Sequence, residues 1–580
     1  MLSAILLLAL TIPPQYWTAE QSGEILARTE TIRLAPDLSM LTEGEQAALK
    51  DLVAVGQIFQ DLYEDALHHQ ALASRERLVK IDAAAAHPKQ TGNLLQLYRL
   101  FKGPIATTLD NDRKPFLDVD PQVQSRNVYP VGITKAEVEA FLTKHPDQRD
   151  TILGERTIVR RATKENVAAD IATLKRHPAL DTLHPRLNAR LSALARTPDA
   201  SVLYAVPYAV AWADQLIKAH ALLRSAADSI EPTDSEFAGY LRNRARDLLT
   251  NDYESGDASW VTGRFKNLNA EIGAYETYDD ALYGVKAFHA VSLLLLNEEA
   301  TAELRRALGS LQDIENALPY KHQKRVRDDI SVGVYRIIAD FGQARGTNTA
   351  TILPNDPLHS ARYGRTILLR ENILRNPEIF ASSSRVWRAS VHESHADDLA
   401  AEGPFQRTLW HEVGHYLGVD RDAQGRTLDV ALQDWADALE EMKADLVSLF
   451  ALQKMNHPSL RAIQASGIHR TLQNAKPRRD QPYQTMQLAQ FNYFLEKKLI
   501  EADPKTARLT IHYERYPTVI AGLLEEVLAI QRAGDHAAAT KFFERWGAWT
   551  PELHEKLAAR IREAQGTSRF RIVRYGALGE

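Results

Sequence analysis

Cysteine is absent from this 580-residue sequence, and its absence restricts the chemistry that the chain can perform. No disulfide framework can form, and any metal site must be built from histidine and carboxylate ligands. The lack of cysteine fits both reducing and oxidising compartments. The length corresponds to two to four domains and is ample for a large hydrophobic core.

Apolar runs long enough to cross a membrane are missing as well. The run from Leu2 to Ile12 is too short to span a bilayer, and no basic residue precedes Arg28. We interpret residues 1–17 as a signal remnant, which favours a periplasmic or secreted location over a cytoplasmic one. No membrane span is therefore expected.

Basic charge is not in excess. The chain has 70 basic and 75 acidic residues and a net charge of -5, within an ordinary globular composition of 44% hydrophobic and 25% charged residues. Bulk charge gives no basic face, so we expect no nucleic-acid partner. Nothing in the composition indicates the oligomeric state.

The most informative stretch is residues 408–418, where His411, Glu412 and His415 form the pattern H-E-x-x-H. Positions four apart share one face of a helix, so the two histidines can hold one metal ion with Glu412 beside it as a base. Apolar residues at helical spacing would anchor the opposite side in a core. The alternative is a core helix that carries two histidines by accident.

Two schemes supply the third ligand that a hydrolytic zinc site needs. In the metzincin pattern the third histidine falls on Arg421, which cannot ligate zinc. In the second scheme a downstream helix, on which Glu441 and Asp445 share a face, brings a carboxylate to the metal. Its other acids would accept the free ring N–H of the ligating histidines. The alternative is a solvated acidic face, but Glu441 lies 26 residues after His415 (441 minus 415) on an otherwise apolar helix, which favours a ligand.

These motifs read His-Glu-Val-Gly-His at 411–415 and Glu-Glu-Met-Lys-Ala-Asp at 440–445. Together they resemble the dipeptidyl-peptidase III family of zinc metallopeptidases, whose motifs are H-E-x-x-G-H and E-E-C-R-A-E/D. Residues 272–279 are similar to the family segment I-G-F-I-E-S-Y-R-D, and residues 352–355 to its substrate strand N-I-P-N. The resemblance covers roughly residues 200–545 and identifies a shortened, bacterial-type variant of the metal motif.

The resemblance implies a role for each residue of the site. Glu441 falls on the third zinc ligand, beside the two histidines, so one Zn²⁺ per chain is expected. Glu440 and Asp445 fall on the second-shell carboxylates that support the ligands. Glu412 falls on the residue that activates water for hydrolysis.

Two positions depart from the family pattern. The histidine that supports the transition state is replaced by Thr485, and a family tyrosine is replaced by Glu271. Both changes remove electrophilic help at the oxyanion, an effect typically worth about 10²–10³ in rate. His469 is a candidate substitute for the lost histidine.

A peptide substrate is expected beside these residues. Residues 348–353 would pair with an extended peptide as an added strand, and acidic residues nearby would hold its free amine. The residues assigned to substrate binding are Glu271, Glu276, Thr349, Ile352, Asn355 and Thr485.

The family resemblance also implies the architecture: a mainly α fold with a smaller α+β part, built as two lobes around a wide cleft. The helical lobe would carry zinc and the other lobe a small β-barrel. The expected parts are a lower lobe over 18–285, mainly helical with short strands, upper-lobe helices over 286–345, lower-lobe strands over 346–370, the helical zinc-binding upper lobe over 371–550, and a C-terminal helix and strand over 551–580 that return to the lower lobe.

Local signals predict individual elements. Thr42 with Glu45, and Thr134 with Glu137, form capping boxes that open helices. Residues 251–283, rich in tyrosine, aspartate, glycine and asparagine, are predicted to be a loop.

The function expected from the resemblance is that of a metallopeptidase: zinc-dependent hydrolysis of short peptides by an exopeptidase that releases N-terminal dipeptides. Two alternatives remain open. One is a zinc-containing peptide-binding protein with little or no turnover, and the other is a zinc hydrolase of non-peptide amides.

Overall fold

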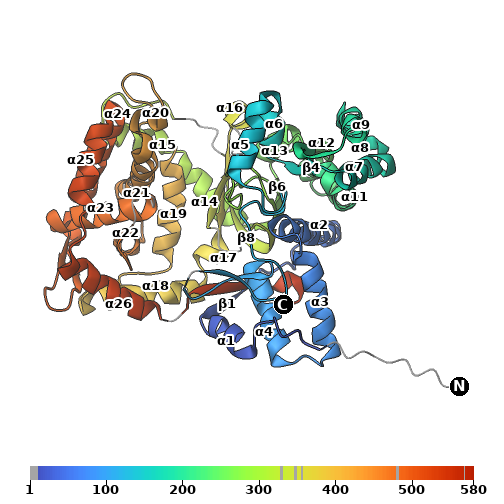
Figure 1. Ribbon diagram of the computed structural model, residues 1–580. Helices are drawn as coiled ribbons and strands as arrows, with labels where there is room; N and C mark the ends of the chain where they lie inside the picture. Colours follow the sequence, from blue (N-terminus) through green and yellow to red (C-terminus); the bar gives the residue numbers. More distant parts are fainter. Residues whose placement is uncertain are drawn as a thin grey trace.

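The computed structural model describes residues 11–110, 112–326, 331–344, 349–353, 357–477, 482–566 and 568–580. Helices dominate, and they form two lobes joined by a central sheet (Figure 1). In that view the lower lobe, mainly blue to green, lies at the right, and the upper lobe, mainly yellow to red, lies at the left. Each lobe has a large hydrophobic core of its own, which confirms the expected mainly α, two-lobed fold.

Helices of the lower lobe come mostly from the first half of the chain. They are α1 Ala19–Leu26, α2 Glu43–Leu67, α3 Ala71–Ala84, α4 Lys89–Phe101, α5 Lys135–Lys144, α6 Arg149–Ile152, α7 Lys164–Arg176, α8 Pro178–Leu183, α9 Leu187–Arg196, α10 Tyr208–Ala211, α11 Ala213–Ile230, α12 Ser235–Thr250 and α13 Glu254–Thr262. Two short helices follow strands of the central sheet: α16 Pro357–Tyr363 and α17 Glu371–Leu374. Both predicted capping boxes are present, at the N-termini of α2 and α5.

Helices of the upper lobe surround the metal motif. They are α14 Glu298–Leu308, α15 Leu311–Ala317, α18 Pro377–Ser390, α19 Glu402–Gly414, α20 Leu428–Leu432, α21 Ala436–Lys454, α22 Leu460–Arg470, α23 Pro482–Glu496, α24 Tyr516–Ala533, α25 His536–Trp546 and α26 Lys556–Gln565. No described helix combines the length and apolar character that a membrane span needs.

The central sheet has five strands in the order β6-β7-β8-β10-β9, with β8 and β10 parallel and the other pairs antiparallel. The strands are β6 Leu268–Ala274, β7 His289–Leu296, β8 Ser331–Gly342, β9 Ala350–Leu353 and β10 Thr366–Arg370. The sheet is curled, as shown by the ion pair between Glu271 on β6 and Arg370 on β10, which have the two strands β7 and β8 between them. This curled sheet stands where a small barrel was expected, although no ladder joins β6 to β9 among the described residues.

The same sheet contributes to both cores. On β10, Ile367 and Leu369 face the upper-lobe core, while Leu368, on the opposite face, lies in the lower-lobe core. In strand β8, Val334 lies in the upper-lobe core and Phe341, nearer the end of the strand, lies in the lower-lobe core. The two lobes are therefore bound to one shared element.

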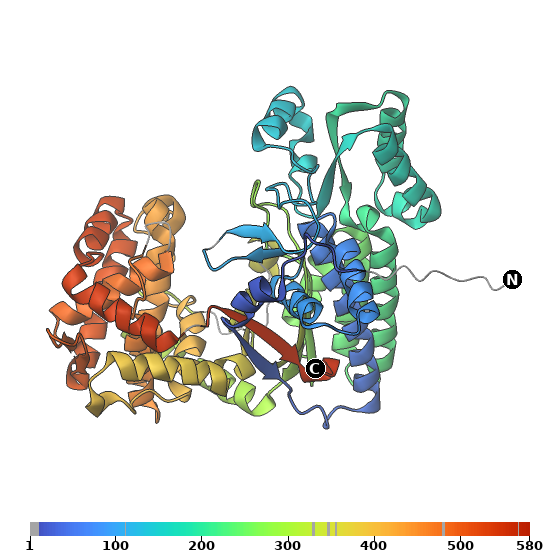
Figure 2. The ribbon, with the colours of Figure 1, turned by 60° about the horizontal axis from the view of Figure 1, so that its bottom comes forward.

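The described residues also form four two-stranded sheets. They are β1 Thr29–Leu34 with β13 Phe570–Tyr575, β2 Ile105–Thr107 with β3 Arg113–Pro115, β4 Thr157–Ala162 with β5 Asp199–Pro207, and β11 Ile500–Ala502 with β12 Leu509–Ile511. Strands β1 and β13 pair in parallel, from Thr29 opposite Phe570 to Leu34 opposite Tyr575. Figure 2 shows the red strand β13 beside the blue strand β1.

Several sequence boundaries differ from the structure. Residues 286–345 are not purely upper-lobe helices, because β7 and β8 belong to the central sheet and only α14 and α15 pack in the upper lobe. The predicted loop at 251–283 contains α13 and β6. Within residues 551–580, β13 pairs with β1 in the lower lobe, whereas α26 packs against α18 in the upper lobe. Tyr16, inside the interpreted signal remnant, is buried in a small lower-lobe core. Residues 1–10 lie outside the described residues.

Candidate metal centre

Two helices of the upper lobe carry the metal motifs. Helix α19 ends at Gly414, so that His411 and Glu412 lie in its last turn and His415 follows directly. Helix α21 packs against it and presents three carboxylates to this turn. Most residues of both helices are buried, so core packing holds the backbone that carries the cluster in place.

His411, His415 and Glu441 form a compact cluster in which one ligand atom from each residue lies within 4.8 Å of the others. His411 Nε2 is 3.1 Å from Glu441 Oε2, and His415 Nε2 is 4.0 Å from Glu441 Oε1. The two imidazole rings are nearly perpendicular, at 86°, with centroids 4.9 Å apart. Two ring nitrogens and one carboxylate therefore converge on a common point.

The remaining ring nitrogens are held from outside the cluster. His411 Nδ1 lies 2.8 Å from Asp445 Oδ1, and His415 Nδ1 lies 2.9 Å from Glu440 Oε1. An ionised carboxylate only accepts hydrogen bonds, so each Nδ1 must carry the proton and donate it. Both Nε2 lone pairs then point at the centre of the cluster, as metal ligation requires.

This arrangement is unfavourable without a positive charge at its centre. The lone pair of His411 Nε2 faces a carboxylate oxygen, Glu441 Oε2, which is buried and receives no hydrogen bond in the described structure. A buried, unpaired acceptor is costly, and a proton or a cation between the two atoms removes the cost. Two imidazoles and one carboxylate are a ligand set that suits Zn²⁺.

The charges around the cluster also favour a positive charge at its centre. Burial lowers the pKa of His411, but the Asp445 and Glu441 carboxylates outweigh burial and raise it to about 9. Burial raises the pKa of Glu440, but Lys443 and His415 more than compensate and bring it to about 2. The carboxylates are therefore ionised at neutral pH and favour positive charge at the centre.

Three cations outside the cluster hold these carboxylates, and the sequence analysis missed all three. Arg407 Nη1 and Arg470 Nε each donate to Asp445 at 2.9 Å, and together with His411 they hold the pKa of Asp445 well below its usual range in spite of burial. Arg407 lies four residues before His411, so helical spacing could have indicated it. No sequence signal pointed to Arg470.

The third cation, Lys443, is buried and joins the two helices. Its Nζ lies 2.8 Å from Glu440 Oε1 and donates to the carbonyls of Gly414 and Leu417 at 3.0 and 2.8 Å. These carbonyls close the C-terminal end of α19, where a cation is favourable. Lys443 thus fixes the end of the helix that carries the histidines.

Gly414 allows the two helices to approach closely. A Cβ atom at this position would lie 2.7 Å from the Ala444 carbonyl oxygen and 2.9 Å from its Cα. Both contacts are with backbone atoms of α21, which cannot rotate away. A glycine inside the H-E-x-x-H motif is therefore needed for the distance between the histidines and the carboxylates.

Glu412 and Tyr483 border the cluster. Glu412 is half-buried and forms no hydrogen bond with another described residue. Tyr483, on α23, donates its hydroxyl to Glu441 Oε1 at 2.9 Å. Its ring lies close enough to Glu412 for that carboxylate to raise the pKa of Tyr483, after the larger effects of burial and Glu441. The sequence analysis missed Tyr483 although it examined Thr485, two residues further on.

The predicted substrate residues are spread over several elements. Glu271 does not extend free from β6, because Arg370 Nη2 holds its carboxylate at 2.6 Å and burial raises its pKa. Glu276 follows β6, and the Thr349 carbonyl accepts from Arg370 N beside β9. For Ile352 the structure describes the backbone pairing with Ile367 and not the side chain.

The three other positions are Asn355, Thr485 and His469. Asn355 lies outside the described residues. Thr485 is on α23 two positions after Tyr483, and residues two apart on a helix point to different sides. His469 packs against Trp387 with ring centroids 6.5 Å apart, and burial lowers its pKa to about 4.

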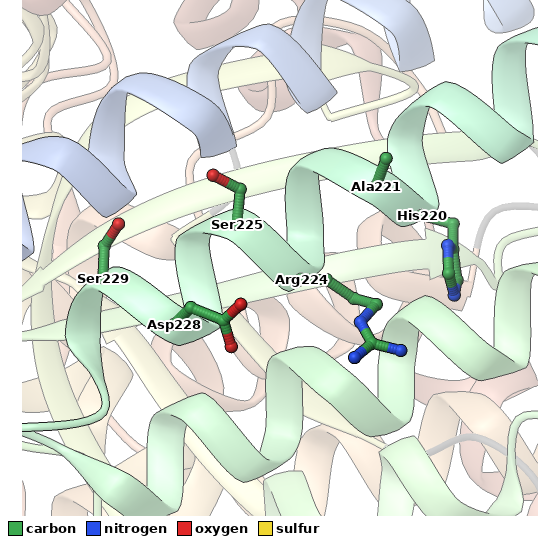
Figure 3. Close-up of a pocket in the computed structure, with 6 residues that line it drawn as sticks. All are labelled: His220, Ala221, Arg224, Ser225, Asp228 and Ser229. Carbon is green, nitrogen blue, oxygen red and sulfur yellow. The ribbon is translucent and has the colours of Figure 1, made fainter.

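A shallow groove in the lower lobe is separate from this site. It runs along α11 and is lined by residues of that helix alone (Figure 3). Arg224 and Asp228 point to one side of the helix and Ser225 and Ser229 to the other. Nothing in the groove resembles the converging donors of the metal cluster.

Comparison with solved structures defines the class of fold: it is the two-lobed fold of dipeptidyl-peptidase III structures. The enzyme from Caldithrix abyssi superposes with a TM-score of 0.77, at 23% identity, over 95% of this chain and 98% of that one. Dipeptidyl-peptidase III from Corallococcus sp. strain EGB gives a TM-score of 0.71, also at 23% identity, over 97% and 98% of the two chains.

Sequence comparison adds one relative and no family. Nudix hydrolase 3 of Arabidopsis thaliana is 23% identical over 574 residues, which are 92% of this chain and 71% of that protein. No protein-family model matches the chain. At these identities the similarities establish the fold, and the chemistry has to be argued from the site.

Proposed function

We propose that this chain is a zinc-dependent peptidase of the dipeptidyl-peptidase III type that hydrolyses short peptides and releases N-terminal dipeptides. The observation that carries the proposal is the convergence of two Nε2 atoms and Glu441, with both Nδ1 atoms bound to carboxylates. The fold shared with two dipeptidyl-peptidase III structures supports the choice of substrate class.

The residues that would hold the zinc ion are His411, His415 and Glu441. When bound, the ion supplies Lewis acidity, which lowers the pKa of a water molecule and polarises the scissile carbonyl. Asp445 and Glu440 keep both imidazoles in the tautomer and orientation that this requires.

Glu412 performs the proton transfers. It accepts a proton from water as the oxygen attacks the carbonyl carbon, and the electron pair of the C=O bond moves to the carbonyl oxygen. When that pair returns and the C–N bond breaks, Glu412 passes the same proton to the leaving amine. The half-buried Glu412 has no hydrogen bond to another described residue that would compete with these transfers.

The test is a comparison of wild type and Glu412→Gln, supplied with zinc and a mixed oligopeptide pool and analysed by mass spectrometry. Wild type should release N-terminal dipeptides. Glu412→Gln should keep one zinc per chain and lose about 10²–10⁴-fold in rate, because it lacks the base. Glu402→Gln is the matched control, since it makes the same charge change on α19 at a residue that binds Arg375 instead.

Three results would contradict the proposal. Native activity in Glu412→Gln would exclude Glu412 as the base, and release of single residues would indicate an aminopeptidase. Intact peptides that bind measurably would favour a peptide-binding protein. The ion pair between Glu271 and Arg370 favours the peptide-binding alternative. The family tyrosine is missing at this position, and the carboxylate that replaces it is already bound to Arg370.

A further inference from the structure

Tyr483 reaches the metal cluster from a third helix, α23, and has no role in the mechanism described above. Its hydroxyl donates to Glu441 Oε1 at 2.9 Å. The side chain is 47% exposed, so it borders solvent as well as the cluster. An exposed tyrosine beside a metal ligand can meet a substrate as well as the carboxylate.

The site needs a donor of this kind. Hydrolysis through an oxyanion is accelerated by a hydrogen bond donor about 2.7–3.1 Å from the developing negative oxygen, in addition to any stabilisation by a metal ion. The family positions that would supply it hold Thr485, two positions after Tyr483 on α23 and so on a different side of that helix, and Glu271, whose carboxylate accepts from Arg370. Tyr483, in contrast, is a donor that reaches Glu441 directly.

Other donors around the cluster are already committed. Arg407 and Arg470 bind Asp445, and Lys443 binds Glu440 and two helix carbonyls. The histidine Nδ1 atoms donate to carboxylates. Arg407 and Lys443 are buried, whereas Tyr483 is an exposed residue.

We propose that Tyr483 is a catalytic residue whose hydroxyl donates a hydrogen bond to the oxyanion of the peptide during hydrolysis. It does so in place of the family histidine and tyrosine. The inference rests on the proposed peptidase function and deepens it. Tyr483 keeps its proton throughout, so that only hydrogen bond strength changes between the ground state and the transition state.

Transfer of the Tyr483 hydrogen bond from Glu441 to the oxyanion is favourable. In the free protein Glu441 holds the hydroxyl in position, so little side-chain entropy is lost on catalysis. Once a cation binds Glu441, its oxygen becomes a weaker acceptor than a full oxyanion nearby. A phenol hydroxyl carries its proton at neutral pH and can donate it. The interaction is thus stronger in the transition state than in the ground state, as catalysis requires.

Tyr483→Phe tests the inference, with Tyr513→Phe as the matched control. Tyr513 also lies in the upper lobe and donates its hydroxyl to a carboxylate, Asp398, at 2.9 Å, away from the cluster. For each protein we would measure kcat and KM on the best-cleaved tetrapeptide, the zinc Kd by chelator competition, and the affinity of a phosphinic analogue of that tetrapeptide by calorimetry.

Tyr483→Phe is expected to lower kcat by about 10²-fold with KM within about threefold. Its affinity for the tetrahedral phosphinic analogue should fall by a similar factor, while its zinc Kd stays within about threefold of wild type. Tyr513→Phe should match wild type in all of these values.

Two results would overturn the inference. The first is a kcat of Tyr483→Phe within about threefold of wild type. The second is a loss of zinc affinity of about 10–100-fold with kcat restored at saturating zinc, which would make Tyr483 a positioning residue for Glu441. If wild type cleaves no peptide, the proposed function fails first. The unchanged phosphinic affinity of Tyr483→Phe would then still refute the oxyanion role.

Discussion

Gly414→Ala should separate the two helices that carry the proposed metal ligands by a distance that the structure sets. The added Cβ would lie 2.7 Å from the Ala444 carbonyl oxygen, whereas ordinary contact begins at 3.4 Å. The backbones of α19 and α21 must therefore move apart by about 0.7 Å (3.4 minus 2.7). Neither contact atom belongs to a flexible side chain that could move instead.

The same movement would lengthen the contacts that orient the histidines. The hydrogen bonds from His411 to Asp445 and from His415 to Glu440 measure 2.8 and 2.9 Å and would approach the limit of useful geometry. Loss of such support typically costs about 10–100-fold in metal affinity. Overpacking of a core contact adds about 1–3 kcal/mol of destabilisation.

Two measurements follow from this geometry: the free energy of unfolding from urea titration, and the zinc Kd from competition with a chelator. Gly239→Ala is the control, because Gly239 lies inside helix α12 and a Cβ there meets no atom within 4 Å. It should gain about 0.5–1 kcal/mol from the lower flexibility of alanine and keep wild-type zinc affinity. Wild-type stability and zinc affinity in Gly414→Ala would refute the claim that this close contact fixes the cluster.

Two further predictions concern buried charge. Lys443→Met removes the cation that binds Glu440 and the end of α19, so it should lose about 3 kcal/mol of stability in urea titration; stability equal to wild type would exclude this role. Burial lowers the pKa of His289 to about 3, against about 6.5 when unfolded, so the folded state binds fewer protons and stability falls as the pH drops below 6.5. Between pH 7 and 5.5 wild type should lose about 1.3 kcal/mol more than His289→Gln, and equal losses would contradict the shift.

The metal cluster was predictable to the extent that helical spacing defines a face. His411 and His415 lie four apart, and the acids of α21 repeat in the same way, so local sequence placed both donor sets on helices. Contacts between elements were not predictable in this way. Tyr483 comes from a third helix, and the need for Gly414 depends on a distance across two helices.

In the fold, too, local features were predictable and contacts between distant elements were not. The capping boxes at Thr42 and Thr134 are local, and both mark helix starts correctly. Strand β7 was misread because a strand buried on both faces reads as a continuous apolar run, which resembles a buried helix. The family resemblance implied a C-terminal strand in the lower lobe, but the local pattern did not identify β1 as its partner.

The parallel pairing of β1 with β13 also sets an order of assembly during synthesis. Strand β1, residues 29–34, has no partner until residues 570–575, about 540 residues later, have been synthesised. At about 5–20 residues per second, the edge of β1 stays unpaired for roughly half a minute to two minutes. The helices that carry the metal ligands, within residues 402–454, emerge well before that moment. The metal cluster can thus form on the ribosome while the lower lobe is still incomplete.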